Sequence, residues 1–185
     1  MTGTQIIRLL LLTDFTESYS YKLFAGIQAY AQEHGRWAVC RMPPSYKSQH
    51  GLEGVLKWAK AWSADALIGR FDAMDRTEIF PEAGILTFAQ DYKVPISSLP
   101  SITGGYREAG AMAADYFITK GFSSFAFVGY RDAFWSQERY YGFRSHLEAH
   151  GLAERLRDFR DISIDEMWDF RQEELIHFLR SLPHS

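Results

Sequence analysis

Short apolar runs alternate with longer stretches of helical periodicity along the whole chain. The run at residues 6–12 is typical of a strand buried on both faces, and further runs predict strands over residues 37–40, 64–68 and 125–129. A short strand is also expected near residues 156–162. Apolar residues at helical spacing predict helices over residues 23–34, 52–62, 106–120, 137–150 and 166–182. Strands and helices that alternate in this way predict βαβ units around a parallel sheet, and hence an α/β fold.

The middle of the chain has a weaker pattern. Residues 74–81 predict a short helix, and residues 85–88 and 94–99 each predict a strand over at least part of their length. Gly104-Gly105 precedes the helix that begins near Tyr106. A turn with positive φ is the favoured interpretation there, ahead of an anion site at the helix N-terminus.

Polar and aromatic residues gather directly after three of the predicted strands. They occupy residues 14–19, 70–72 and 135–139. In parallel α/β sheets, ligands bind outside the carboxyl ends of the strands. Carboxylates and guanidinium groups bind hydroxyls, and aromatic rings pack on the apolar face of a sugar, so these clusters suit a polyol. The alternative is that each cluster only caps the helix that follows it. Ser18 or Asp14 would be the cap after the first strand, and Asp72 or Asp75 would be the cap after the third strand.

Charge and apolar length argue against two classes of partner. The formal net charge of −3 is a poor footprint for nucleic acid, which favours clustered lysine and arginine. The longest apolar run, residues 6–12, contains Arg8 and is too short to span a bilayer. No signal-peptide pattern is present, so we expect a cytoplasmic protein without a membrane partner.

The motifs of common enzymes and metal sites are missing from the sequence. There is no phosphate-binding loop of the G-x-x-x-x-G-K-[ST] type and no G-x-S-x-G nucleophile elbow. Cys40 is the only cysteine, and His146 and His150 are an i, i+4 pair without the H-E-x-x-H pattern. We therefore expect no catalytic residues, no metal and no cofactor.

Several segments resemble lac-repressor-like sensor domains, above all those of xylose operon regulators. Residues 106–129 resemble the family pattern AG-x-x-AA-x-(H/Y)-(L/F)-x-x-(R/K)-GF-x-x-FAF-x-G, and residues 135–143 are similar to WS-x-x-R-x-x-GF. Residues 19–37 resemble Y-x-x-x-L-x-x-GI-x-x-YA-x-x-HG-x-W, and residues 168–183 resemble W…L-x-x-LP. The resemblance thus extends over nearly the whole chain.

The resemblance implies a periplasmic-binding-protein-like fold of two Rossmann-type lobes with parallel sheets, closing on a sugar. The first lobe would cover residues 1–121, and residues 122–185 would begin a second lobe that is incomplete here. The family carries an arabinose-activator-type helix-turn-helix module after the sensor, which this chain lacks. Family members bind DNA as homodimers through that module, and the sugar is the effector.

The resemblance also assigns candidate ligand-binding residues. Arg139 matches the arginine that hydrogen-bonds sugar hydroxyls in this superfamily. The other candidates lie in the same segment, in the first strand–helix loop or at the end of the third strand: Trp135, Ser136, Asp14, Glu17, Tyr19, Arg70 and Asp72. Many relatives carry an acidic pair where this chain has residues 103–106, a departure that weakens the case for D-xylose itself.

Taken together, these features predict the ligand-sensing region of a bacterial transcription activator for the use of xylose or another pentose. Two alternatives stay open. A transport-type sugar-binding protein would share the fold, but it would carry a signal peptide. A small α/β enzyme would need a strongly perturbed titratable pair in a cleft, and the sequence offers no motif for one.

Overall fold

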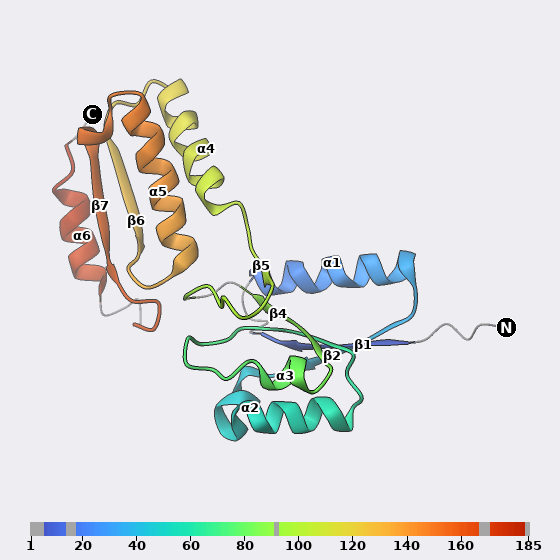
Figure 1. Cartoon of the computed structure of the whole chain (residues 1–185). Coiled ribbons are helices and arrows are strands. Elements are labelled where there is room, and N and C mark those ends of the chain that lie inside the picture. Colours follow the sequence, from blue (N-terminus) through green and yellow to red (C-terminus); the bar gives the residue numbers. More distant parts are fainter. Residues whose placement is uncertain (1–5, 14–17, 91–92, 167–170, 184–185) are drawn as a thin grey trace. The chain divides into compact units, whose positions relative to one another are not determined.

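The computed structural model describes residues 6–13, 18–90, 93–166 and 171–183 (Figure 1). The chain divides into two compact units. Unit 1 comprises residues 1–90 and 95–102, and unit 2 comprises residues 91–94 and 103–185. Each unit is built around its own parallel sheet.

Unit 1 contains a five-stranded parallel sheet in the order β2-β1-β3-β4-β5. Its strands are β1 (Ile7–Leu12), β2 (Trp37–Met42), β3 (Ala66–Gly69), β4 (Leu86–Gln90) and β5 (Ser101–Ile102). Its helices are α1 (Ser18–His34), α2 (Pro44–Ala61) and α3 (Ile79–Glu82). Figure 1 shows α1 on one face of this sheet and α2 with α3 on the other.

Strand β1 lies between β2 and β3, and both of its faces are covered. Leu10 and Leu12 pack in the cluster that contains Val55 and Ala59 of α2. Leu9 and Leu11 pack in a second cluster with Leu23, Phe24 and Ile27 of α1. A strand buried on both faces needs apolar residues at every position, which explains its continuous run of leucines.

Unit 2 contains a two-stranded parallel sheet of β6 (Phe125–Tyr130) and β7 (Leu156–Ile162). Its helices are α4 (Tyr106–Thr119), α5 (Phe134–Ala149) and α6 (Gln172–Arg180), and a 3-10 turn, η1 (Ala153–Arg155), precedes β7. Phe125, Phe143 and Leu147 form the core with Ala114 of α4. The rings of Phe159 and Phe178 stack at 5.4 Å, which places α6 against β7.

Two glycines bring the backbones of α4 and α5 into direct contact. A Cβ added to Gly110 would lie 2.0 Å from the carbonyl oxygen of Arg139, and one added to Gly142 would lie 1.8 Å from that of Arg107. Only glycine allows such an approach. Because α4 packs so closely on α5, it belongs to unit 2, and the division falls after Ile102 rather than at residue 121 as the sequence analysis expected.

Two local expectations differ from the structure. Residues 94–99 form bends and turns instead of a strand, and the pairing with β4 occurs at Ser101–Ile102. Pro95 and Pro100 lack the N–H that a strand of a sheet donates, which explains the interruption. The prediction of positive φ at Gly104-Gly105 is wrong, since neither residue has it and Gly105 has a φ of −72°.

Candidate functional site

A row of polar side chains lies at the carboxyl ends of the strands of unit 1. Thr13 directly follows β1, Arg70 directly follows β3, and Gln90 is the last residue of β4. The register pairs Leu12 with Gly69 and Gly69 with Ala89, so the three polar residues are neighbours across the sheet. Side chains alternate between faces, and the residues two positions earlier lie in the α1 cluster. The row therefore lies on the face covered by α1.

Ser20 in the first turn of α1 connects the row. The hydroxyls of Thr13 and Ser20 share a hydrogen bond of 3.0 Å and are both buried. Arg70 Nη2 donates to Ser20 Oγ at 3.4 Å. The structure thus brings the predicted site residue Arg70 together with two hydroxyl groups.

Gln90 is the most informative member of the row. Its side chain is 2% exposed, and neither Oε1 nor Nε2 has a hydrogen-bond partner. Leaving a buried amide unsatisfied costs about 1–3 kcal/mol, so such a group calls for a functional explanation or a bound partner. Gln90 was not among the residues predicted for the site, because the strand predicted from the sequence ends at residue 88. Extending that strand by two residues would have placed Gln90 at its end.

The other predicted residues of unit 1 have different surroundings. Asp14 and Glu17 lie outside the described residues. Tyr19 lies in the first turn of α1, directly before Ser20, and is 40% exposed. Asp72 accepts a hydrogen bond from Lys47 Nζ of α2 at 3.0 Å, and Lys47 also pairs with Asp75. Asp72 therefore interacts with the helix on the opposite face of the sheet from α1.

In unit 2, the structure brings Trp135 and Arg139 together but gives Ser136 a separate position. The guanidinium of Arg139 lies 5.0 Å from the ring centroid of Trp135. Ser136 is buried, and its Oγ accepts a hydrogen bond from the Tyr130 N–H at 2.9 Å. The Ser136 hydroxyl thus stabilises the turn between β6 and α5, while Arg139 is exposed.

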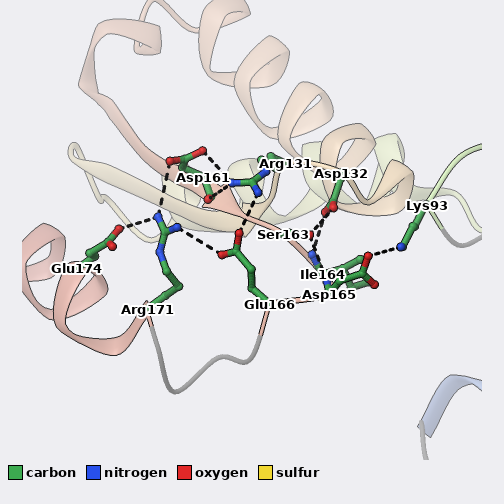
Figure 2. A network of polar contacts seen from close by, with 10 residues as sticks. All are labelled: Lys93, Arg131, Asp132, Asp161, Ser163, Ile164, Asp165, Glu166, Arg171 and Glu174. Carbon is green, nitrogen blue, oxygen red and sulfur yellow. Dashed lines mark hydrogen bonds and ion pairs between the residues drawn. The ribbon is translucent and has the colours of Figure 1, made fainter.

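An ion-pair network joins the carboxyl ends of β6 and β7 (Figure 2). Arg131 follows β6 and contacts Asp161 at 3.3 Å and Glu166 at 2.8 Å. Arg171 contacts Glu166 at 3.3 Å and Glu174 at 2.6 Å. Each acidic group of the network has an arginine partner, so the network is consistent with a structural role. The sequence analysis did not name these residues, although Arg131 follows a predicted strand.

A second set of contacts in Figure 2 surrounds Asp132. Its carboxylate accepts hydrogen bonds from Ser163 Oγ at 2.5 Å and from the Ile164 N–H at 2.8 Å. Burial alone would raise the pKa of Asp132, but these hydrogen bonds outweigh it, so the pKa lies below its ordinary value. Asp132 therefore connects the segment after β7 to the end of β6 through hydrogen bonds.

Asp132→Asn is expected to lower the free energy of unfolding at neutral pH by about 1–2 kcal/mol, because charge-assisted hydrogen bonds become neutral ones. The pKa of Asp132 is depressed in the folded state. Its contribution is therefore complete above the unfolded-state pKa of 3.8 and is lost as the pH falls through the lower folded-state value. Urea unfolding of both proteins from neutral pH down to about pH 3 measures the difference.

Asp165→Asn is the matched control for this prediction. Asp165 lies in the same segment and pairs with Lys93, but its side chain is 62% exposed. An exposed ion pair contributes about 0–1 kcal/mol, so this variant should unfold nearly as the wild type does. Equal losses in the two variants, or a loss at Asp132 that does not change with pH, would contradict the assignment.

Within the described ranges, no three metal-ligating side chains form a group that could hold a metal ion. The same ranges contain no helix with the length and apolar character of a membrane span.

Comparisons with known proteins identify the fold. No family model matches the sequence, and no curated protein matches it. A Cra transcriptional dual regulator from Pseudomonas putida, solved with fructose 1-phosphate, superposes with a TM-score of 0.65 at 21% identity. A LacI transcriptional regulator from a Rhodococcus species gives 0.69 at 15% identity, and an ABC transporter solute-binding protein from Burkholderia multivorans gives 0.65 at 14%.

These matches include almost all of the chain. They cover 98%, 97% and 98% of it, and 67%, 64% and 68% of the three proteins in the same order. The chain therefore spans about two-thirds of their length. Its fold is that of LacI-type regulators and periplasmic-binding-protein-like domains, which confirms the α/β fold class expected from the sequence. All three proteins are regulators or binding proteins.

Proposed function

We propose that this chain is the ligand-sensing region of a cytoplasmic bacterial transcription activator, with xylose or another pentose as its effector. In this proposal it is not an enzyme. It acts on DNA through a helix-turn-helix module outside these residues, and the full-length protein is a homodimer. The shared fold supports the proposal, since a regulator of this fold has been solved with a sugar phosphate.

The observation that carries the proposal is the group of Thr13, Ser20, Arg70 and Gln90, in which Arg70 is partly buried and the other three are buried. Hydroxyl and amide groups both donate and accept hydrogen bonds, and a guanidinium donates several. A sugar hydroxyl also does both, so the row matches a polyol chemically. The two unsatisfied atoms of Gln90 support a ligand that supplies one donor and one acceptor.

In unit 2, Arg139 and Trp135 are ligand-binding candidates in their own right. Arg139 provides N–H donors at the start of α5, and Trp135 provides a flat apolar surface of the kind that packs on sugar C–H groups. Ser136 is left out of the proposed site because its hydroxyl serves the backbone of Tyr130. Asp14 and Glu17 stay in it as predictions.

A transport-type sugar-binding protein is the second candidate function. The match to an ABC transporter solute-binding protein favours it. The two candidates differ in one property, because only a regulator changes its affinity for DNA when the sugar binds.

Calorimetric titration of the full-length protein with D-xylose, L-arabinose, D-ribose, D-glucose and fructose 1-phosphate tests the proposal. We expect at least one pentose to bind and to change the affinity for operator DNA. Arg139→Ala is expected to weaken that binding at least about tenfold, since hydrogen bonds from a charged group contribute about 1.5–3 kcal/mol.

Arg155→Ala is the control for this experiment. Arg155 is also exposed but lies in η1, before the amino end of β7, and the variant should bind as the wild type does. If no sugar of the panel binds, the proposal fails. Sugar binding without any change in DNA affinity would favour the transport protein.

A further inference from the structure

The guanidinium of Arg139 lies over two aromatic rings that come from different helices. It is 5.0 Å from the centroid of Trp135, four residues earlier on α5, and 5.3 Å from that of Tyr106, the first residue of α4. Both distances lie within the range of cation–π attraction. We call these three side chains the aromatic clamp.

Close packing of the two helices places Tyr106 beside Arg139. A Cβ on Gly110 would lie 2.0 Å from the Arg139 carbonyl oxygen, so the start of α4 is held against this turn of α5. Arg107, next to Tyr106, donates to both carboxylate oxygens of Glu138 at 2.9 and 3.0 Å. The same turns of the helices are thus fixed by backbone contact and by a bidentate ion pair.

Gly104 leaves the space that the ring of Tyr106 occupies. A Cβ at Gly104 would lie 2.8 Å from Cε1 and 3.2 Å from Cζ of the Tyr106 ring. Its lack of a side chain is therefore explained by the ring, and not by a turn of positive φ. A side chain at position 104 would therefore displace the Tyr106 ring from this position.

The side chain of Arg139 makes different contacts from those of Arg107 and Arg131, two other arginines of unit 2. Arg107 pairs with Glu138, and Arg131 pairs with Asp161 and Glu166. In the described part of the chain, Arg139 makes no hydrogen bond or ion pair, and its contacts are with the two rings. A cation–π contact uses the face of the guanidinium and leaves the N–H donors in its plane available.

We propose that Tyr106 and Trp135 are positioning residues that orient the Arg139 guanidinium for a ligand. An exposed arginine loses side-chain freedom when it binds, and a guanidinium already held by two rings loses less. The ligand in this proposal is the sugar of the proposed function, on which it rests. Removing the Tyr106 ring is expected to weaken sugar binding about three- to tenfold, without removing any group that is proposed to contact the sugar.

Tyr106→Leu and Tyr106→Phe separate this role from simple packing. The phenylalanine variant keeps the ring face, and the leucine variant keeps an apolar side chain without one. The first readout is the Nε–Hε NMR resonance of Arg139, identified by its loss in Arg139→Lys. We expect ring-current shifts in the wild type and in Tyr106→Phe, and a move towards the position of a free arginine in Tyr106→Leu.

This readout needs no ligand, so its failure is distinguishable from failure of the proposed function. An Arg139 resonance that is the same in Tyr106→Leu and the wild type overturns the clamp. If Tyr106→Leu fails to fold by urea unfolding, Trp135→Leu and Trp135→Phe provide the same comparison from α5.

The second readout is the affinity for D-xylose and for fructose 1-phosphate in the full-length protein. Tyr106→Leu should weaken binding in the presence of Arg139 and have no further effect on Arg139→Ala, because the ring acts through the arginine. Equal losses in both backgrounds overturn the positioning role. If neither compound binds, the comparison is made with whichever of L-arabinose, D-ribose and D-glucose binds the wild type. If none of the five sugars binds while the resonance shifts are intact, the proposed function is contradicted, and with it the role of the clamp in binding.

Discussion

Gly142→Ala is expected to destabilise unit 2 by about 3 kcal/mol or more, the upper end for overpacking at a tight contact. The new Cβ would lie 1.8 Å from the carbonyl oxygen of Arg107, 2.7 Å from its carbonyl carbon and 2.9 Å from its Cα. These are backbone atoms, which cannot rotate away as the end of a side chain can. Helices α4 and α5 must therefore separate, and this loosens the packing of Ala114 on Phe143.

Amide hydrogen exchange is the measurement suited to this prediction, because it reports the stability of each unit separately. Exchange in β6 and α5 should become faster, while exchange in β1 and β3 stays as in the wild type.

Gly26→Ala is the matched control for Gly142→Ala. Gly26 lies within α1, and a Cβ there would have nothing within 4 Å. Alanine in an open helical position is expected to stabilise the protein by about 0.5–1 kcal/mol. If Gly142→Ala changes protection no more than Gly26→Ala does, the close contact of α4 and α5 is refuted.

Strand β1 was predictable from the sequence because burial on both faces leaves a direct trace in it. The run at residues 6–12 corresponds to β1 at Ile7–Leu12, and the prediction for residues 156–162 matches β7. Gly35, Gly121 and Gly151 directly follow the helices predicted over residues 23–34, 106–120 and 137–150, and all three have positive φ. Apolar continuity and glycine conformation are local properties, so one sequence suffices to recognise them.

Features that depend on contacts between distant residues could not be predicted in the same way. Membership of α4 in unit 2 follows from the fit of Gly110 and Gly142 against α5, which has no signature in either helix alone. The pairing of Tyr106 with Arg139 is another such contact. Among the candidate site residues, the sequence suggested Arg70, Trp135 and Arg139, whereas the burial of Gln90 is a property of the folded chain alone.

Gln90→Leu is expected to change stability and sugar binding in opposite directions. Leucine is close in size to glutamine and has no polar atoms, so it removes two buried atoms that lack partners. The free energy of unfolding of unit 1 should rise by about 1–2 kcal/mol, since a buried amide without hydrogen bonds is costly. The same change removes the amide that we propose to hydrogen-bond the sugar, and affinity should fall about tenfold or more.

Urea unfolding and calorimetric titration of the full-length protein measure the two effects, with Gln28→Leu as the control. Gln28 is exposed on α1, and its replacement should alter the free energy of unfolding by less than about 0.5 kcal/mol and leave binding unchanged. A gain of stability together with a loss of affinity is the result expected of a residue kept for function at a cost to the fold. If Gln90→Leu instead destabilises unit 1 and binds sugar normally, the amide stabilises the fold. The row at the carboxyl ends of β1, β3 and β4 is then not the sugar-binding site.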